Sequence, residues 1–252
     1  EIIVVDNASR DKSESMVQTH FPEVTWIQNK KNLGFSAGNN VGLRQAQGEV
    51  LMLLNSDTEI QGNALEILYQ TLIQDEELGA VGPRLELASG EIDWGSHRGQ
   101  PNLWNSLTYF SGLEHLGIMP KIFGQYHQTW QDLSTPHSID VISGGALMFK
   151  REILNRVGFL DEQFFMYAED IDYCTRIRQA GYKILFQPRA KITHHKGQSG
   201  TYNVDAAIRQ KTRYHFYHTM KLYFRKHYQD EYPSWLMWMI ERGIDLVAKV
   251  RG

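Results

Sequence analysis

Apolar residues near the start of the chain fall into short continuous runs, separated by stretches in which they recur at helical spacing. The runs predict buried strands at residues 1–5, 24–28 and 49–54. The intervening stretches predict helices, the first with Met16 and Val17 facing inward, and a further helix is expected from Asn63. Strands that alternate with helices are typical of an α/β domain with a largely parallel sheet.

The pattern weakens over residues 84–140, which are rich in Gly, Trp, His and Asn, and no element is predicted there. Farther along, strands are predicted at 139–143, 146–150, 183–186 and 191–193, and a helix at 169–179. Gly197, Ser199 and Gly200 cluster as in a loop. We therefore expect an α/β domain over residues 1–200 and a helical extension over 201–252.

Polar side chains follow several predicted strands at the point where each strand ends. They are Asp6-Asn7, Asn55-Ser56-Asp57 and His194-His195. In an open α/β sheet the ligand crevice lies beyond the carboxyl ends of the strands. These side chains are therefore expected to gather at one rim and to form a ligand site.

Composition narrows the class of protein and of site. The 252 residues include a single cysteine, Cys174, which excludes a disulfide framework and any multi-cysteine zinc or iron–sulfur site. The formal net charge of −3 gives no general attraction to nucleic acid. No apolar run reaches the roughly 18 residues of a spanning helix, and no signal-peptide pattern is present, so a cytoplasmic protein is the simplest expectation. Glu1 lies inside a predicted strand, so the natural start is expected upstream.

Asn55 and Asp57 offer oxygen ligands on one side of an extended chain. Mg²⁺ and Mn²⁺ prefer such ligands and commonly take others from substrate phosphates. Alone, Asp57 could equally be a turn former. His194 and His195 could be surface residues, or one could ligate Mn²⁺ through a neutral imidazole.

Three acids open the helix predicted at 169–179: Glu169, Asp170 and Asp172. Carboxylates are favoured in a first helical turn, which is the structural explanation. Three exceed what capping needs, however, and a carboxylate among aromatic residues can have a raised pKa that suits a general base. Gly144-Gly145 is either a tight turn or a point where the backbone approaches a ligand closely.

Together the motifs resemble the family 2 glycosyltransferases of GT-A fold, in particular the bacterial rhamnosyltransferase-like branch. The similarity runs in order from Glu1 to about Gly200. Its motifs are VVDNASRD (4–11), NLGFSAGNNVGL (32–43), LLNSDT (53–58), SGGALMFKRE (143–152), GFLDEQFFMYAEDIDYCTRIRQAGYKI (158–184) and HHKGQS (194–199). The resemblance implies a mixed, mainly parallel sheet flanked by helices. The family usually has a strand and a helix ahead of the segment matched by Glu1, and both are expected to be missing here.

The resemblance also implies roles for individual residues. Asp170 would be the catalytic base, and Asp57 and His194 would hold Mg²⁺ or Mn²⁺. Asn55 departs from the family's D-x-D metal motif, which leaves one charged ligand fewer. The donor would be bound by Asp6, Asn7, Asn32, Gly34, Gly38, Asn39, Ser56, Gly144, Gly145 and Glu169.

The implied activity is inverting transfer of a sugar from a nucleotide-sugar donor to a glycan or lipid-linked saccharide, in cell-surface polysaccharide synthesis. The best candidate is L-rhamnose from dTDP-rhamnose. A non-catalytic carbohydrate-binding protein is the alternative, with Trp94, Trp104 and Trp130 as stacking platforms. The absence of G-x-G-x-x-G speaks against a nucleotide-binding oxidoreductase.

Residues 205–252 carry nine Lys/Arg against five Asp/Glu, unlike the acidic remainder. After Pro233, residues 234–250 predict an amphipathic helix with Trp235 and Trp238 near its start. One interpretation is a helical hairpin packed on the α/β domain or on a second subunit of a homodimer. The other is a peripheral membrane anchor through 233–250, in which basic and aromatic residues meet anionic lipid.

Overall fold

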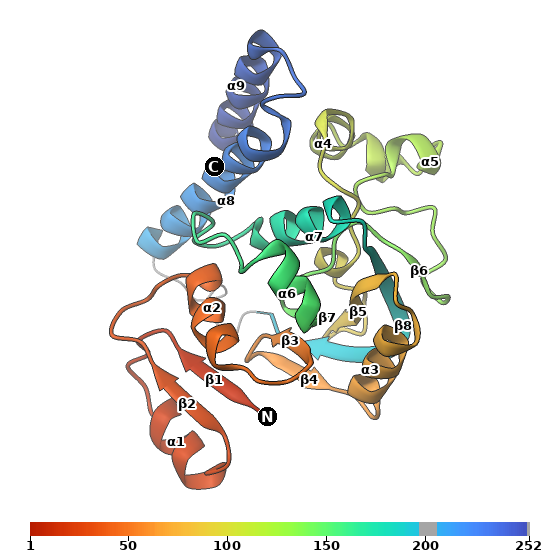
Figure 1. The fold of residues 1–252 in the computed structure, drawn as a ribbon. Coiled ribbons are helices and arrows are strands. Elements are labelled where there is room, and N and C mark those ends of the chain that lie inside the picture. The colour runs from red at the N-terminus through yellow and green to blue at the C-terminus, as the bar shows by residue number, and fades with distance from the viewer. Residues whose placement is uncertain (197–205, 251–252) are drawn as a thin grey trace.

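The computed structural model describes residues 1–196 and 206–250 of the chain (Figure 1). The predicted boundary near residue 200, and its loop, lie outside the described residues. The elements are β1 (Ile3–Asp6), α1 (Ser13–His20), β2 (Thr25–Gln28), α2 (Phe35–Gln45), β3 (Val50–Leu54), β4 (Thr58–Ile60), α3 (Ala64–Gln74), β5 (Leu78–Leu87), η1 (Trp94–Ser96), α4 (Leu103–Phe110), η2 (Leu113–Leu116), α5 (Pro120–Phe123), β6 (His137–Ser138), β7 (Ala146–Lys150), α6 (Arg151–Val157), α7 (Glu169–Gln179), β8 (Lys183–His194), α8 (Ala206–Tyr228) and α9 (Ser234–Val250).

The strands form a mixed sheet, as predicted, and a separate parallel pair. The six-stranded sheet has the order β3-β7-β5-β8-β4, with β6 also paired to β8, while β1 pairs with β2 alone. The expectation that parallel pairs dominate is wrong. Among the described strands only β1–β2 and β5–β8 are parallel, and the other pairs are antiparallel.

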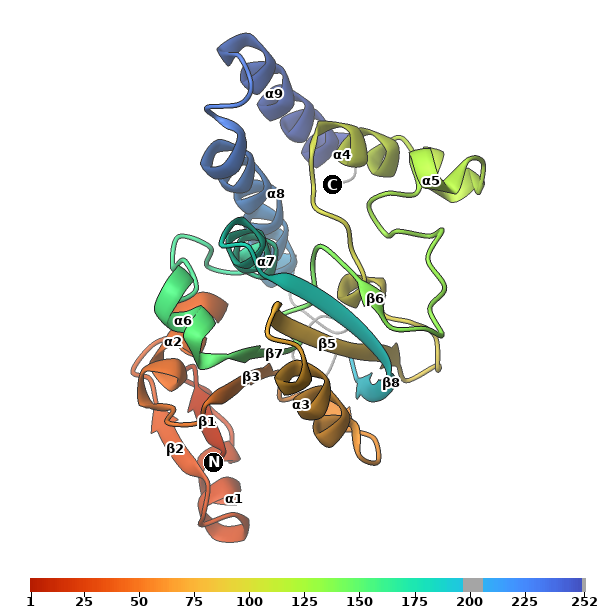
Figure 2. The ribbon, with the colours of Figure 1, turned by 45° about the vertical axis from the view of Figure 1, so that its right-hand side comes forward.

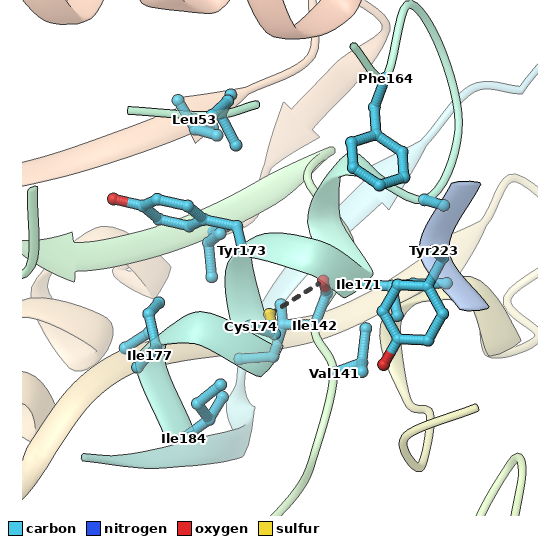
Figure 3. Packing of buried hydrophobic residues seen from close by; sticks show 14 of the residues in the cluster. Leu53, Val141, Ile142, Phe164, Ile171, Tyr173, Cys174, Ile177, Ile184 and Tyr223 are labelled. Atoms are coloured by element: carbon cyan, nitrogen blue, oxygen red, sulfur yellow. Dashed lines mark hydrogen bonds between the residues drawn. The ribbon is translucent and has the colours of Figure 1, made fainter. Parts of the chain in front are cut away.

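Helices cover both faces of the six-stranded sheet, so the fold has three layers (Figure 2). On one face, Leu68 and Leu72 of α3 are fully buried against β5, β7 and β8. On the other face, α6 packs on β7 and α7 packs on β8. Tyr173 of α7 is fully buried there (Figure 3) and contacts the buried ring of Phe149. The single cysteine, Cys174, is inert here: burial raises the pKa of its thiol to about 12.

The C-terminal helices pack on this second face and on each other. Phe224 of α8 and Ile240 and Ile244 of α9 belong to the same buried cluster as the sheet residues. Arg225 forms a two-pronged ion pair with Glu241, and Lys221 pairs with Asp245, so α8 neutralises the acids of α9. Among the described residues, no helix has the length and apolar character needed to cross a bilayer.

Several predicted elements differ from those observed. The central strand β5 was not predicted, because its Gly79, Gly82 and Pro83 resemble a loop. The predicted strands at 183–186 and 191–193 are one strand, β8, with a register irregularity near Gln187 where it meets β5. Residues 139–143 form only an isolated bridge to Arg98, and Met16 is 46% exposed rather than inward.

Candidate active site

Asp57 and His194 are brought together by strand pairing. The two residues lie at adjoining ends of β4 and β8, where Thr58 pairs with His194 in the antiparallel register. As a result, Asp57 Oδ1 lies 3.3 Å from His194 Nε2, and both side chains are more than nine-tenths buried. His195 points elsewhere and pairs with the exposed carboxylate of Glu59. Of the two histidines, only His194 therefore faces Asp57.

Asp93, a residue that the sequence patterns did not identify, orients His194. Its Oδ2 lies 2.9 Å from His194 Nδ1, and its Oδ1 accepts hydrogen bonds from Lys196 Nζ and the Gly95 amide. Burial works against the charge of Asp93, but the contacts with His194 and Lys196 outweigh it and lower its pKa well below the ordinary range. A charged Asp93 accepts the hydrogen on His194 Nδ1, so Nε2 is the ring nitrogen that faces Asp57.

This arrangement fits a divalent cation. His194 Nε2 and Asp57 Oδ1 lie 3.3 Å apart, and either a second proton on the ring or a cation bound by both atoms makes this contact favourable. Carboxylate oxygen and neutral imidazole are both ligands of Mn²⁺, and a second carboxylate behind the histidine is the usual partner of a metal-bound imidazole. Within residues 1–196 and 206–250 no three His, Cys, Asp or Glu side chains are grouped as a metal site.

The second half of the site is the acid pair at the start of α7. Asp170 Oδ2 lies 2.6 Å from Arg98 Nη2 and also accepts the Gly144 amide at 3.2 Å. Its Oδ1 accepts the amide of Ile171. The Arg98 side chain is only 12% exposed, and within the described residues its ion pair is with Asp170, so the guanidinium orients this carboxyl group.

Glu169 has a different environment from its neighbour. It is 7% exposed, and its Oε2 has no hydrogen-bond partner among the described atoms. Burial, with the adjacent charge of Asp170, raises the pKa of Glu169 to about 8. Near neutral pH Glu169 therefore keeps its proton. Tyr167 and Ala168, with φ of 72° and 62°, set the turn that presents them.

The third acid of the helix is structural. Asp172 is fully buried and contacts Arg176, Lys226 and His227, so it fastens α7 to α8. Burial opposes its charge, but these partners outweigh burial and lower its pKa. Asp172 thus points away from the face of α7 that carries Asp170.

Two segments join the halves of the site. In the first, Gly144 donates to Asp170 while the carbonyl of Gly145 accepts the amide of Asn55, two residues before Asp57. The second is residues 93–98, which we call the bridging segment. Its first residue contacts His194 and its last contacts Asp170. Two segments therefore link the Asp57–His194 pair to the Glu169–Asp170 pair.

The residues predicted to bind the donor base and ribose surround the start of α2. Asn7 donates to the carbonyl of Gly34 and accepts from Asn29, and Asn32 accepts the Gly34 amide. Asp6 accepts the amide of Ser9, and Gln28 donates to the same carboxylate. Burial opposes the charge of Asp6, yet these bonds lower its pKa. Gly38 packs against Asn7, and Asn39 donates to the carbonyl of Phe35. Ser56 lies apart from this loop and is exposed beside Asp57.

Gly34 connects this loop to the acid pair. Its φ is +85°, and a Cβ there would lie 2.3 Å from the carbonyl oxygen of Phe165. That carbonyl accepts the amide of Phe35, which sets the first turn of α2 against the aromatic run ahead of Glu169. Buried Asn40, another residue that the patterns missed, makes a second link through Leu160. The two elements therefore share one wall of the site.

Asp93 and Arg98 were not predicted as site residues because the apolar residues in 84–140 follow no regular helix or strand spacing. Nothing local marks an acid before a 3₁₀ turn as the partner of a histidine 101 residues away. Only the packing of the bridging segment against β8 and α7 identifies them.

Comparisons with known proteins agree on the class of protein. A family model described as glycosyl transferase family 2 matches residues 1–158. A low-salt glycan biosynthesis hexosyltransferase of Haloferax volcanii, Agl10, is 28% identical over 73% of this chain and 55% of its own length. An N-acetylglucosaminyl-diphospho-decaprenol L-rhamnosyltransferase of Mycobacterium tuberculosis is 25% identical over 79% of this chain and 67% of its own. The chain thus spans about half the length of the Haloferax relative.

Among solved structures, a mannosyltransferase of Pyrobaculum calidifontis, in complex with GDP-Man and Mn²⁺, superposes with a TM-score of 0.55. It is 20% identical, and the match covers 98% of this chain and 60% of that one. At this identity the likeness shows the fold alone, and the fold is GT-A.

Proposed function

Because the chain belongs to glycosyl transferase family 2, we propose that it transfers a sugar from a nucleotide-sugar donor to a glycan or lipid-linked saccharide during cell-surface polysaccharide synthesis. The observation that carries this proposal is the convergence of two pairs. The first pair is Asp57 and His194, which would hold a cation, and the second is the acid pair Glu169 and Asp170. Gly144-Gly145 and the bridging segment join the two pairs. Asp57 and His194 would hold the cation that binds a diphosphate leaving group, and the acid pair supplies a base for an attacking hydroxyl.

The reaction we propose is a single in-line displacement with inversion at the anomeric carbon. Asp170 accepts the proton of an acceptor hydroxyl as that oxygen bonds to the anomeric carbon. The bond to the nucleoside diphosphate breaks on the opposite face, and the diphosphate leaves as an anion. Asp57 and His194 would hold a Mg²⁺ or Mn²⁺ ion, which supplies positive charge for that anion when bound. Arg98 keeps Asp170 oriented, while Glu169 stays protonated and adds no second charge beside it.

For the donor we propose dTDP-L-rhamnose. The support is the similarity to the mycobacterial protein, whose name describes an L-rhamnosyltransferase acting on a diphospho-decaprenol-linked sugar. The Haloferax relative is named only a hexosyltransferase, so other hexoses are the alternatives to test.

We also propose that the protein works at a lipid surface. The outward stripe of α9 carries Trp235, Trp238, Met239 and Leu246, each more than half exposed. Arg242 stacks over Trp238 on this stripe. Glu241 and Asp245 pair with α8, and Asp245 also lies 4.0 Å from Arg242. Exposed indoles beside a basic residue favour the headgroup region of an anionic bilayer. A homodimer contact through the same stripe is the competing outcome.

The test is release of nucleoside diphosphate from a panel of nucleotide sugars, with Mn²⁺ or Mg²⁺ and an acceptor extract. We expect turnover with dTDP-rhamnose, loss of turnover in excess EDTA, and loss in the Asp57→Ala variant. The His195→Ala variant is the control, since His195 faces Glu59 and not the site. Full turnover in EDTA would remove the cation from the proposal. Donor binding without turnover on any acceptor would favour a carbohydrate-binding protein.

A further inference from the structure

His97 lies in the bridging segment directly before Arg98 but makes its contacts away from the site. It is fully buried, and its Nε2 lies 2.7 Å from Nε2 of His137 on the edge strand β6. The segment therefore contacts three places: Asp93 reaches His194, Arg98 reaches Asp170, and His97 reaches β6. The first two contacts serve the site, and the third holds the segment to the sheet.

The hydrogen bonds made by Nδ1 of His97 and of His137 determine where each ring carries its hydrogen. His97 Nδ1 lies 2.9 Å from the carbonyl oxygen of His127, and His137 Nδ1 lies 2.8 Å from that of Thr135. A carbonyl oxygen can only accept, so both Nδ1 atoms must carry hydrogen. In a neutral imidazole the remaining nitrogen is then a lone pair. Two neutral rings would thus present two lone pairs to each other at 2.7 Å, and one additional proton turns this contact into a hydrogen bond.

We propose that His97 and His137 share one proton, and that this proton holds the bridging segment where Asp93 and Arg98 position His194 and Asp170. The inference rests on the proposed sugar transfer for its functional part. All four residues involved, Asp93, Arg98, His97 and His137, act as positioning residues. Loss of the proton would replace an attraction with a repulsion at His97, next to Arg98.

The surroundings decide which ring carries the charge. Burial lowers the pKa of His97 to about 4, so the proton resides on half-buried His137, which donates to the lone pair of His97. The rings of Trp94 and Phe186 border His97 and are neutral. The titratable groups nearby are His127, which is bonded to Glu114, and the exposed carboxylate of Asp132, whose charge favours a protonated His137.

The proton can be observed without substrate, by ¹⁵N NMR of the histidine side chains across about pH 5 to 9. At low pH we expect His97 neutral with hydrogen on Nδ1, His137 doubly protonated, and loss of that second proton as the pH rises. A pair that stays neutral throughout, with hydrogen on one Nε2, would overturn the proposal. This NMR measurement gives an answer even if the chain transfers no sugar. A negative result for the shared proton is therefore distinct from a negative result for the proposed function.

Two variants test the link to the site. The amide of His137→Gln donates a hydrogen bond without titrating, so transfer should persist and lose its decline at high pH. His137→Leu donates nothing, so kcat should fall about tenfold at every pH, with a smaller change in KM. His20→Gln, on an exposed helix, is the control and should retain the wild-type profile. A wild-type pH profile in His137→Gln, or wild-type kcat in His137→Leu, would show that the pair does not position the site.

Discussion

The guanidinium of Arg98 lies 2.6 Å from the carboxylate of Asp170, although 72 residues separate them in the chain. Both side chains are only 12% exposed, and the Arg98 Nε has no partner among the described atoms. The contact fixes the charge and the direction of the proposed base. It also means that neither residue can be changed without leaving the other as an unmatched buried charge.

Asp170→Asn should therefore have two effects. Transfer should fall by at least ~10²-fold, because an amide cannot accept the proton of the acceptor hydroxyl. The free energy of unfolding should also fall, by roughly 3 kcal/mol, because Arg98 loses its counter-charge. Steady-state kinetics and urea denaturation measure the two effects.

The double variant Arg98→Gln/Asp170→Asn separates them. It should recover most of the stability and none of the transfer. Recovery of transfer in the double variant would mean that Asp170 serves only to neutralise Arg98.

Asp93→Asn should weaken Mn²⁺-dependent donor binding about 10- to 100-fold, although Asp93 need not touch the cation. A carboxylate can only accept from His194 Nδ1, whereas an asparagine side chain lacks the negative charge and can also turn its NH₂ group toward that nitrogen. Asp57→Ala and His194→Ala should weaken binding at least as much, since each removes a proposed ligand. Calorimetry of nucleoside diphosphate with and without Mn²⁺ measures this. Equal affinity for Asp93→Asn and wild type would assign Asp93 to holding Lys196 alone.

Glu169 should make the protein less stable as the pH rises through the neutral range. Its pKa in the folded protein is about 8, above the ordinary value of 4.5, so the folded state binds more protons between these values. Its contribution is complete below about pH 4.5 and is lost as the pH rises toward 8. Glu169→Gln cannot lose a proton, so its stability relative to wild type should increase from pH 5 to pH 8. If the urea denaturation curves of wild type and Glu169→Gln keep the same separation from pH 5 to pH 8, the raised pKa of Glu169 is contradicted.

The exposed stripe of α9 should bind vesicles that contain anionic lipid. The protein should co-sediment with them at low salt, and high salt should weaken the association. The variant Trp235→Ser/Trp238→Ser/Leu246→Ser should remain in the supernatant. Removal of α9 is a poorer test, because Ile240 and Ile244 belong to the core. Trp130→Ser, which changes an exposed indole elsewhere, is the control. A concentration-dependent dimer that the triple variant abolishes, with no vesicle binding, would assign the stripe to self-association.

Local patterns in the sequence determined much of the fold. The periodicity placed α7 and α9 at their observed bounds, and the polar residues at strand ends located the rim that carries Asp57 and His194. These predictions succeed because amphipathic spacing and strand ends are properties of neighbouring residues.

Only the tertiary structure decided the rest. Strand β5 is central because Gly82 allows Ile142 to pack directly on its backbone, where a Cβ would lie 2.3 Å from that side chain, and no local signal distinguishes this from a loop. The family resemblance already pointed to His194 and Asp170, but the surroundings of these residues, the structural contacts of Asp172 and the contacts of Asp93 and Arg98 depend on distant segments. Charge, proton position and burial at a site are set by what packs against each residue, and that information appears only when the chain has folded.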